Sequence, residues 1–314
     1  MLRYILKRLL MLIPVTLGVS FLIYGCMELA AGDPISMIAP DATGEAYEAL
    51  KIKYGYDKSV FYRYFLYISN FLRGDLGTSI SMNKPVLELY MTALPNTIQL
   101  AVTAVIFGHL IAIPLGIISA VKRGTVIDNC SLAVALVGVS MPNFWAGLLL
   151  ILMFSLGLGW LPSYGNTAGI KSLILPAITL GLDCTASLTR TTRSSLIDII
   201  HQDYLHTARV KGVSEKIVII KHALKNALIP ILTVSGMQLG GTLGGSIVTE
   251  TVFAWPGVGR LLIEAINQRD VQLATGCILM TTILKCLIQL VVDVLYAYVD
   301  PRIKAQYTRG KKKA

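Results

Sequence analysis

The sequence predicts an all-α protein that crosses a membrane six times. Of its 314 residues, 54% are hydrophobic and only 15% are charged, and the mean hydropathy is +0.65. A soluble domain carries about 25% charged residues, so the composition indicates a polytopic membrane protein. The net charge of +10 comes from basic residues that flank apolar segments, which is typical of membrane topology rather than of nucleic-acid binding.

The first span is predicted from Leu9 to about Leu29, after a surface-lying amphipathic start that contains Arg3, Lys7 and Arg8. Basic residues before a first span favour an N-terminus inside the cell. Further spans are predicted over residues 95–121, 131–158, 172–192, 228–249 and 271–298. The connecting segments alternate between basic and mixed charge, so both termini are expected in the cytoplasm.

The same pattern divides the chain into four parts. Residues 1–30 hold the start and the first span, residues 31–94 form an extracytoplasmic domain, residues 95–300 form a core of five spans, and residues 301–314 are a basic tail. Within the outer domain, the aromatic segment Phe61–Phe71 is either an interfacial helix or a helix packed inside that domain.

The third span contains Pro142, which is expected to break the helix midway. Polar groups beside such a break are tolerated only where they face protein or water, so Ser140, Met141 and Asn143 are candidates for lining a path. A purely structural kink is the alternative. The fourth span is rich in threonine and contains Asp183, which indicates a helix in the bundle interior.

Two charged residues fall inside predicted spans, Asp183 in the fourth and Lys285 in the sixth. Neither is tolerated facing lipid, and their depths are similar. One hypothesis is that they pair across the bundle, and the other is that Asp183 lines a path. Transport and expression unchanged by Asp183→Asn and Lys285→Met would contradict both.

Small residues repeat every four positions in the fifth span, at Gly236, Gly240 and Gly244, which predicts close helix packing. If the partner is a related subunit, this face could instead be a dimer seam or pore wall. The outer loop that follows, residues 251–260, places two aromatic residues before a Pro-Gly turn and suits a segment that dips into the membrane interface.

A basic, polar stretch separates the fourth and fifth spans. Tyr204, Ala208 and Gly212 are spaced four apart and share one helix face, while Arg209 and Lys211 lie on other faces. Gly212 is expected to end this short helix. Its small residues suit docking into a groove on a partner, and an ordinary inner loop is the alternative.

The sequence lacks common nucleotide-binding and hydrolase motifs: it has no GxxxxGK[ST], HExxH or GxSxG. The four histidines do not cluster, and His109 is interpreted as a hydrogen-bonded packing residue. The five cysteines lack CxxC or zinc spacing. The chain is therefore expected to be no enzyme by itself and to bind no metal or cofactor.

Several motifs resemble one family. Residues 203–212 and 221–230 are similar to the two ends of the "EAA" coupling-loop motif of ABC-importer permeases of the dipeptide, oligopeptide and nickel branch. The resemblance places the coupling loop of this chain at residues 196–227. His206-Thr207-Ala208 stands in place of Glu-Ala-Ala, and His206 stands where arginine is expected. The segment from Phe253 to Gly259 and the Asp-Pro-Arg-Ile-Lys end at residues 300–304 also resemble the family.

The resemblance implies a type I-like permease in the bacterial cytoplasmic membrane. Its partners would be a second similar permease, two cytoplasmic ATPases that bind ATP and Mg, an extracytoplasmic substrate-binding protein and membrane lipid, with no nucleic acid. It would import di- or oligopeptides by alternating access, with nickel or a metal chelate as the alternative substrate. An ion-coupled secondary transporter that uses Asp183 is the alternative from another class, and the docking loop argues against it.

The resemblance also implies roles for particular residues. Contact with the ATPases is expected from Asp203, Tyr204, Thr207, Ala208, Arg209, Lys211, Gly212, His222 and Asn226. Contact with the binding protein, or gating of the path, is expected from Phe253, Trp255, Pro256, Gly257 and Gly259.

Overall fold

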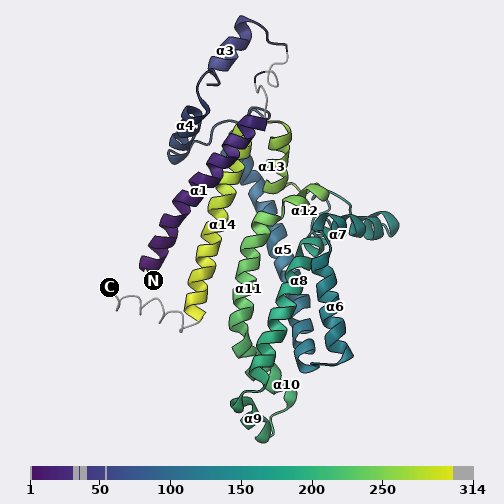
Figure 1. The fold of residues 1–314 in the computed structure, drawn as a ribbon. Helices are drawn as coiled ribbons and strands as arrows, with labels where there is room; N and C mark the ends of the chain where they lie inside the picture. Colours follow the sequence, from purple (N-terminus) through teal and green to yellow (C-terminus); the bar gives the residue numbers. More distant parts are fainter. Residues whose placement is uncertain (1, 31–34, 36–40, 54, 300–314) are drawn as a thin grey trace.

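The computed structural model describes residues 2–30, 35, 41–53 and 55–299, and within these ranges it contains helices and no β-strand (Figure 1). A lone β-bridge joins Thr78 to Pro85. The predicted all-α class is confirmed for this part of the chain. The motif expected at residues 300–304 and the basic tail 301–314 lie outside the described residues.

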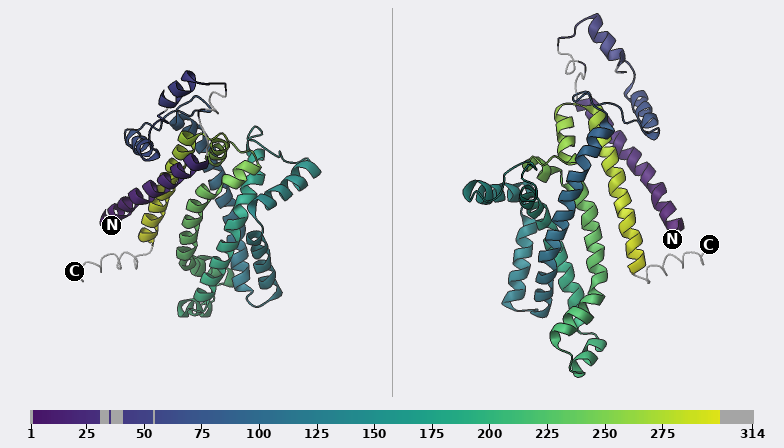
Figure 2. Two further views of the ribbon diagram at one scale, coloured as in Figure 1. Left: turned by 45° about the horizontal axis from the view of Figure 1, so that its top comes forward. Right: turned by 180° about the vertical axis from the view of Figure 1, so that it is seen from behind.

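Within those ranges, five helices are long and apolar enough to cross a membrane. They are α1 (Leu2–Ala30), α5 (Val86–Val121), α8 (Ile170–Ile200), α11 (Leu224–Gly245) and α14 (Val271–Val299). Two short segments, α10 (Glu215–Ile217) and the π-helical η2 (Val218–Ala223), extend α11 at its start. In Figures 1 and 2 the first turn of α1 and the last turn of α14 point towards the same end of the bundle.

The third predicted span is broken, as Pro142 indicated. The chain forms α6 (Val126–Ser140), then α7 (Asn143–Leu150) and the π-helical η1 (Ile151–Gly157). The two halves meet at 98°, so a sixth span exists only if both are counted as one. Proline at residue 142 cannot donate its backbone bond, and α7 restarts directly after it.

Shorter helices connect the long ones. They are α3 (Glu45–Lys53), α4 (Val60–Leu72), α9 (Asp203–Val210), α12 (Ile247–Val252) and α13 (Val258–Asn267). The predicted outer loop over residues 251–260 therefore contains the end of α12, a turn and the start of α13.

Two long helices begin before the predicted spans. α1 is continuous from Leu2, so the basic start and the first span form one helix. α5 begins at Val86, so the helix that carries the second span also includes residues 86–94. Pro95 lies inside α5 because a membrane helix tolerates one lost backbone bond when its neighbours pack around it.

Glycines bring α5 and α8 into close contact, and this pair forms the centre of the bundle. A Cβ atom added to Gly181 would lie 2.8 Å from the Ala104 carbonyl oxygen, and one on Gly108 would lie 2.9 Å from the Cys184 Cβ. The buried hydroxyls of Thr179 and Thr185 donate to carbonyls one turn back in α8, at 2.9 Å each. The prediction that this polar helix lies in the interior is confirmed.

A buried ion pair fixes the turn between α5 and α6 against α8. Arg193 donates to both oxygens of Asp128, at 2.8 Å each. Asp128 also accepts from the Ser119 hydroxyl and from the Gly124 backbone N–H. The side chain of Asp128 is only 2% exposed, so its buried negative charge is stabilised by these partners rather than by water.

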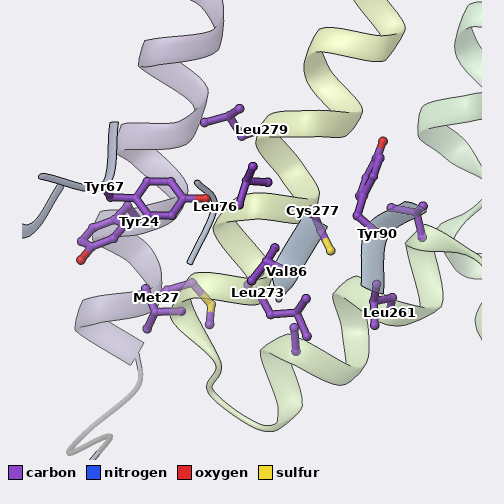
Figure 3. Close-up of a cluster of buried hydrophobic side chains, with 14 of the residues drawn as sticks. Tyr24, Met27, Tyr67, Leu76, Val86, Tyr90, Leu261, Leu273, Cys277 and Leu279 are labelled. Atoms are coloured by element: carbon purple, nitrogen blue, oxygen red, sulfur yellow. The ribbon is translucent and has the colours of Figure 1, made fainter. Parts of the chain in front are cut away.

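At the opposite end of the bundle, aromatic and aliphatic side chains from α1, α4, α5, α13 and α14 form one apolar cluster. Figure 3 shows Tyr24 and Tyr67 beside Leu76 and Leu279, with Cys277 facing Tyr90. This cluster joins the outer segment to the spans.

The aromatic segment of α4 combines features of both predicted alternatives. Tyr64 and Tyr67 are buried against α1, and Arg63 forms a bidentate pair with Glu28 of α1 at 2.6 and 2.7 Å. The other face of α4 is exposed, including Phe61 and Phe65. The helix is therefore packed against the first span on one side and presents aromatic rings to its surroundings on the other.

Candidate functional site

The short helix α9 lies beyond the end of the long helices, between α8 and α11, as Figures 1 and 2 show. It ends as the sequence predicted, with Gly212 in the left-handed region at φ +81°. The Gly212 N–H donates to the Arg209 carbonyl (2.9 Å), and the Val213 N–H donates to the Ala208 carbonyl (3.2 Å). This pair of bonds is a Schellman motif, which satisfies the last carbonyls of α9.

Two contacts hold α9 against the start of α11. Leu205 is fully buried in an apolar cluster with Leu196, Val218 and Ala223. The Asn226 side-chain amide donates to the Tyr204 hydroxyl at 2.7 Å. A helix of this length is unstable alone, so these contacts give it its fixed position.

Arg209 closes the loop that carries α9. Its guanidinium donates to both oxygens of Glu215, at 3.0 Å each, and to the Ile200 carbonyl at 3.3 Å. The hydrogen-bonded Glu215 carboxylate raises the pKa of Arg209 above its ordinary value. The guanidinium is thus engaged within the chain, and its predicted contact with an ATPase is not visible in this geometry.

Ala208, one of the residues predicted to contact an ATPase, is half-buried. It packs against the Leu205 cluster because α9 uses positions 205 and 208 to cover its apolar side. The exposed residues, which we call the α9 surface, are Asp203, Tyr204, His206, Thr207, Val210, Lys211 and Gly212. His222 is half-buried in η2, and its carbonyl accepts a long bond from Asn226 (3.4 Å).

The break between α6 and α7 lies beside α8. The Asn143 amide donates to Asp183 at 2.7 Å, which links the predicted path residues Asn143 and Asp183. The Ser140 hydroxyl donates to the Leu136 carbonyl of its own helix (2.9 Å), and Met141 caps α6. Asp183 is exposed. Together with Ser187, Arg190 and Ser194 it forms an exposed polar stripe along one face of α8.

Asp183 and Lys285 do not form the predicted pair. No ion pair joins them in the part of the chain that the structure describes, where Asp183 bonds Asn143 instead. The reason is the arrangement of helices: α8 packs against α5, α6 and α11, whereas α14 packs against α1, α11 and α13. Lys285 lies against Gly244 of α11.

A fully buried carboxylate that the sequence reasoning missed organises the turn after α12. Glu250 is 0% exposed and accepts bonds from the Thr97 and Ser246 hydroxyls (2.8 Å each) and from the Arg260 backbone N–H (3.1 Å). The Val258 N–H donates to the same Thr97 hydroxyl at 2.8 Å. An acid inside an otherwise apolar segment, preceding a Pro-Gly turn, was the signal that could have revealed it.

The aromatic residues of this turn, which were predicted to dip into the membrane interface, are buried in the core of the protein. Phe253 and Trp255 are each 1% exposed. The Trp255 indole donates to the Asn96 carbonyl (3.0 Å), and the Asn96 amide donates to the Pro256 carbonyl (2.9 Å). Gly257 and Gly259 lie against the Glu250 carboxylate, where any side chain would collide.

The glycine repeat of α11 packs within the chain. A Cβ on Gly236 would collide with Val292, one on Gly240 would lie 3.3 Å from Gln289, and one on Gly244 would lie 3.4 Å from the Lys285 nitrogen. All three neighbours belong to α14, so the repeat serves the predicted helix packing. Among the described residues, no group of three His, Cys, Asp or Glu side chains is placed to hold a metal ion.

Comparisons with known proteins agree with this architecture. Residues 112–305 match the family model described as the binding-protein-dependent transport system inner membrane component. The chain is 42% identical to the dipeptide transport system permease protein DppB of Alkalihalophilus pseudofirmus, over 97% of this chain and 100% of that protein. It is also 42% identical to the glutathione transport system permease protein GsiC of Escherichia coli (strain K12), over 97% and 99%.

Solved structures are similar at the level of the fold. A chain of the inward-facing MetNI methionine ABC transporter, in its native crystal form, superposes with a TM-score of 0.59 at 20% identity. This match covers 70% of the present chain and 100% of that chain. An amino acid ABC transporter with histidines gives a TM-score of 0.51 at 17% identity, covering 69% and 94%.

Proposed function

We propose that this chain, which belongs to the family of binding-protein-dependent transport system inner membrane components, is a permease subunit. The transporter that contains it would be an ATP-driven importer of small peptides. Permease subunits of this family are not enzymes by themselves. The relatives named for dipeptide and glutathione transport support peptides as the substrate class. They favour peptides over the nickel alternative.

The observation that carries this proposal is the position of α9. The α9 surface stands clear of the long helices, yet the helix is held rigidly by Leu205, Asn226 and the Arg209–Glu215 pair. A helix held in this way can transmit a movement of a bound ATPase to α8 and α11. Arg209 and Asn226 then act by positioning the helix, and Tyr204, Val210 and Lys211 make the contact.

The finer topology follows from the same proposal. The end that carries α9 is cytoplasmic, both termini lie on that side, and α3, α4 and the turn between α12 and α13 lie on the outer side. The α6–α7 pair supplies the sixth crossing. Two ATPases would bind at the cytoplasmic end, and a binding protein would dock at the other end.

The exposed stripe of α8 supports a translocation path. Exposed polar residues inside a membrane must face water or another protein, and Asp183, Ser187 and Arg190 lie on one such face. A second, similar permease placed opposite this face would complete the path. Alternating access would open it first to the outside and then to the cytoplasm.

The test is a pull-down of the tagged chain from its native membrane in mild detergent. Wild type should recover two ATPases and a second permease. Val210→Asp should lose the ATPases and keep the permease, because it places a charge on the α9 surface without touching the core.

Val126→Asp is the matched control, since both valines are 76% exposed and Val126 lies at the turn between α5 and α6. Equal loss of ATPases in both variants, or recovery of the chain alone in wild type, would refute the proposal.

A further inference from the structure

A cleft of about 220 Å³ opens between α11, α12, α13 and α14. Its walls are apolar where α11 and α13 contribute, and its polar groups come from Thr281, Thr282 and Lys285 of α14. The space admits a small charged group with a few waters but not a whole peptide. A site of this kind can therefore recognise one end of a larger molecule.

Lys285 has no acidic partner within the described ranges. Glu250 lies behind the cleft wall, because Gly259 lines the cleft and lies against the Glu250 carboxylate. The oxygens of Glu250 are already engaged by Thr97, Ser246 and the Arg260 N–H. The ammonium of Lys285 therefore faces the cleft without a counter-charge.

The depth of Lys285 restricts what can neutralise it. It lies about 20 Å along α14 from Val271, at a rise of about 1.5 Å per residue. The hydrocarbon layer is about 30 Å thick, so a side chain about 20 Å along this span lies inside the layer. An unpaired ammonium at this depth is expensive, which favours an anion that enters the cleft beside α14.

Gly244 directs the lysine towards the cleft. A Cβ atom at Gly244 would lie 3.5 Å from the Lys285 Cδ and 3.4 Å from its Nζ, so the stem rests on bare helix backbone. The Thr282 hydroxyl is a further donor for an anion, and the Thr281 hydroxyl beside it shares a 3.4 Å bond with the Tyr90 hydroxyl. The cleft thus offers a cation with hydroxyl groups beside it, which is the chemistry that holds a carboxylate.

We propose that Lys285 binds a carboxylate of the transported peptide during its passage through the membrane. The inference rests on the proposed function, because a peptide is the cargo that brings a carboxylate to this depth. Lys285 is then a specificity-determining residue of the path, selecting for a free carboxylate rather than for side-chain shape.

The test uses the complete transporter, reconstituted in liposomes with its binding protein, and measures uptake of labelled Ala-Ala and labelled glutathione. Lys285→Arg should keep uptake within about twofold of wild type. Lys285→Met should lower uptake at least tenfold, and Lys285→Glu should lower it further, because it repels the carboxylate. ATP hydrolysis stimulated by the loaded binding protein should stay within twofold in all three variants.

Lys122→Met and Lys122→Glu make the same charge changes at an exposed turn and should transport like wild type. The proposal is overturned if Lys285→Met transports normally, or if Lys285→Glu transports as well as Lys285→Met. It is also overturned if ATP hydrolysis and complex yield fall in parallel with uptake, since that shows a structural role or a partner's acid. If wild type imports neither peptide, the proposed function itself fails.

Discussion

The buried carboxylate of Glu250 should be essential for the stability of the turn between α12 and α13. It is fully buried and accepts from two hydroxyls and one backbone N–H, at 2.8 to 3.1 Å. Replacing it by leucine removes the acceptor and leaves three buried donors. Replacing it by glutamine keeps one oxygen but turns an NH2 group towards the remaining donors.

The magnitudes follow from the bonds that are lost. A buried donor without a partner is destabilising by about 1–3 kcal/mol, so three donors give at least about 3 kcal/mol for Glu250→Leu. Glu250→Gln loses one bond to a charged group, about 1.5–3 kcal/mol. At about 2–4 °C per kcal/mol, the leucine variant should lower Tm by about 6–12 °C.

Thermal unfolding can be followed by the reaction of the buried thiols of Cys184 and Cys277 with a fluorescent maleimide. The two exposed cysteines, Cys26 and Cys130, would be serine in all variants. Glu264→Gln is the control, because Glu264 makes only a surface pair with Arg260 and should shift Tm by about 1 °C or less. A Glu250→Leu protein as stable as wild type, or more stable than Glu250→Gln, would refute the reasoning.

Three further substitutions test the packing of the bundle and the α9 surface. Arg193→Met should destabilise the chain by about 3 kcal/mol in thermal unfolding, because it leaves the buried Asp128 without its counter-charge. Gly181→Ala should lower stability by about 1–3 kcal/mol, since its Cβ would press on the Ala104 carbonyl at 2.8 Å. Gly212→Ala should destabilise the end of α9 by about 1–2 kcal/mol, because alanine disfavours the left-handed conformation of this position. Proteolysis of the loop should become faster as a result.

Each of these has a matched comparison. Adding Asp128→Asn to Arg193→Met should restore part of the stability, and no recovery would argue against the ion pair. Gly25→Ala, in α1, meets no atom within 4 Å and should be neutral or stabilising, so equal effects at Gly25 and Gly181 would contradict the packing argument. Gly212→Asn should be milder than Gly212→Ala, because asparagine tolerates the left-handed region better.

The spans could be predicted because their signal is local. Long apolar runs and flanking basic residues identified α11, α14 and the start of α8 closely, and Pro142 marked the break between α6 and α7. The end of α8 was predicted near residue 192, but the helix continues to Ile200. The start of α5 was misplaced because Pro95 was interpreted as a boundary. Whether a proline ends a helix depends on the neighbours that pack around it, and these are not visible in the sequence.

The candidate site was predicted in part for the same reason. The end of α9 at Gly212 is a local property of the backbone, and the sequence determined it. The face that α9 buries was not predictable from spacing alone, because Leu205 and Ala208 turn inward only when Val218 and Ala223 are placed beside them. Arg209 was assigned to a partner, and its bond to Glu215 depends on the folding back of the loop.

By itself, the sequence determined that this is a helical membrane protein, that a short basic segment lies between two spans, and that its motifs resemble those of an importer permease. Only the tertiary structure decided which charges meet. It separated Asp183 from Lys285, joined Glu250 to Thr97, and buried Trp255 in the core. Such contacts depend on the rotation and neighbours of each helix, which hydropathy does not record.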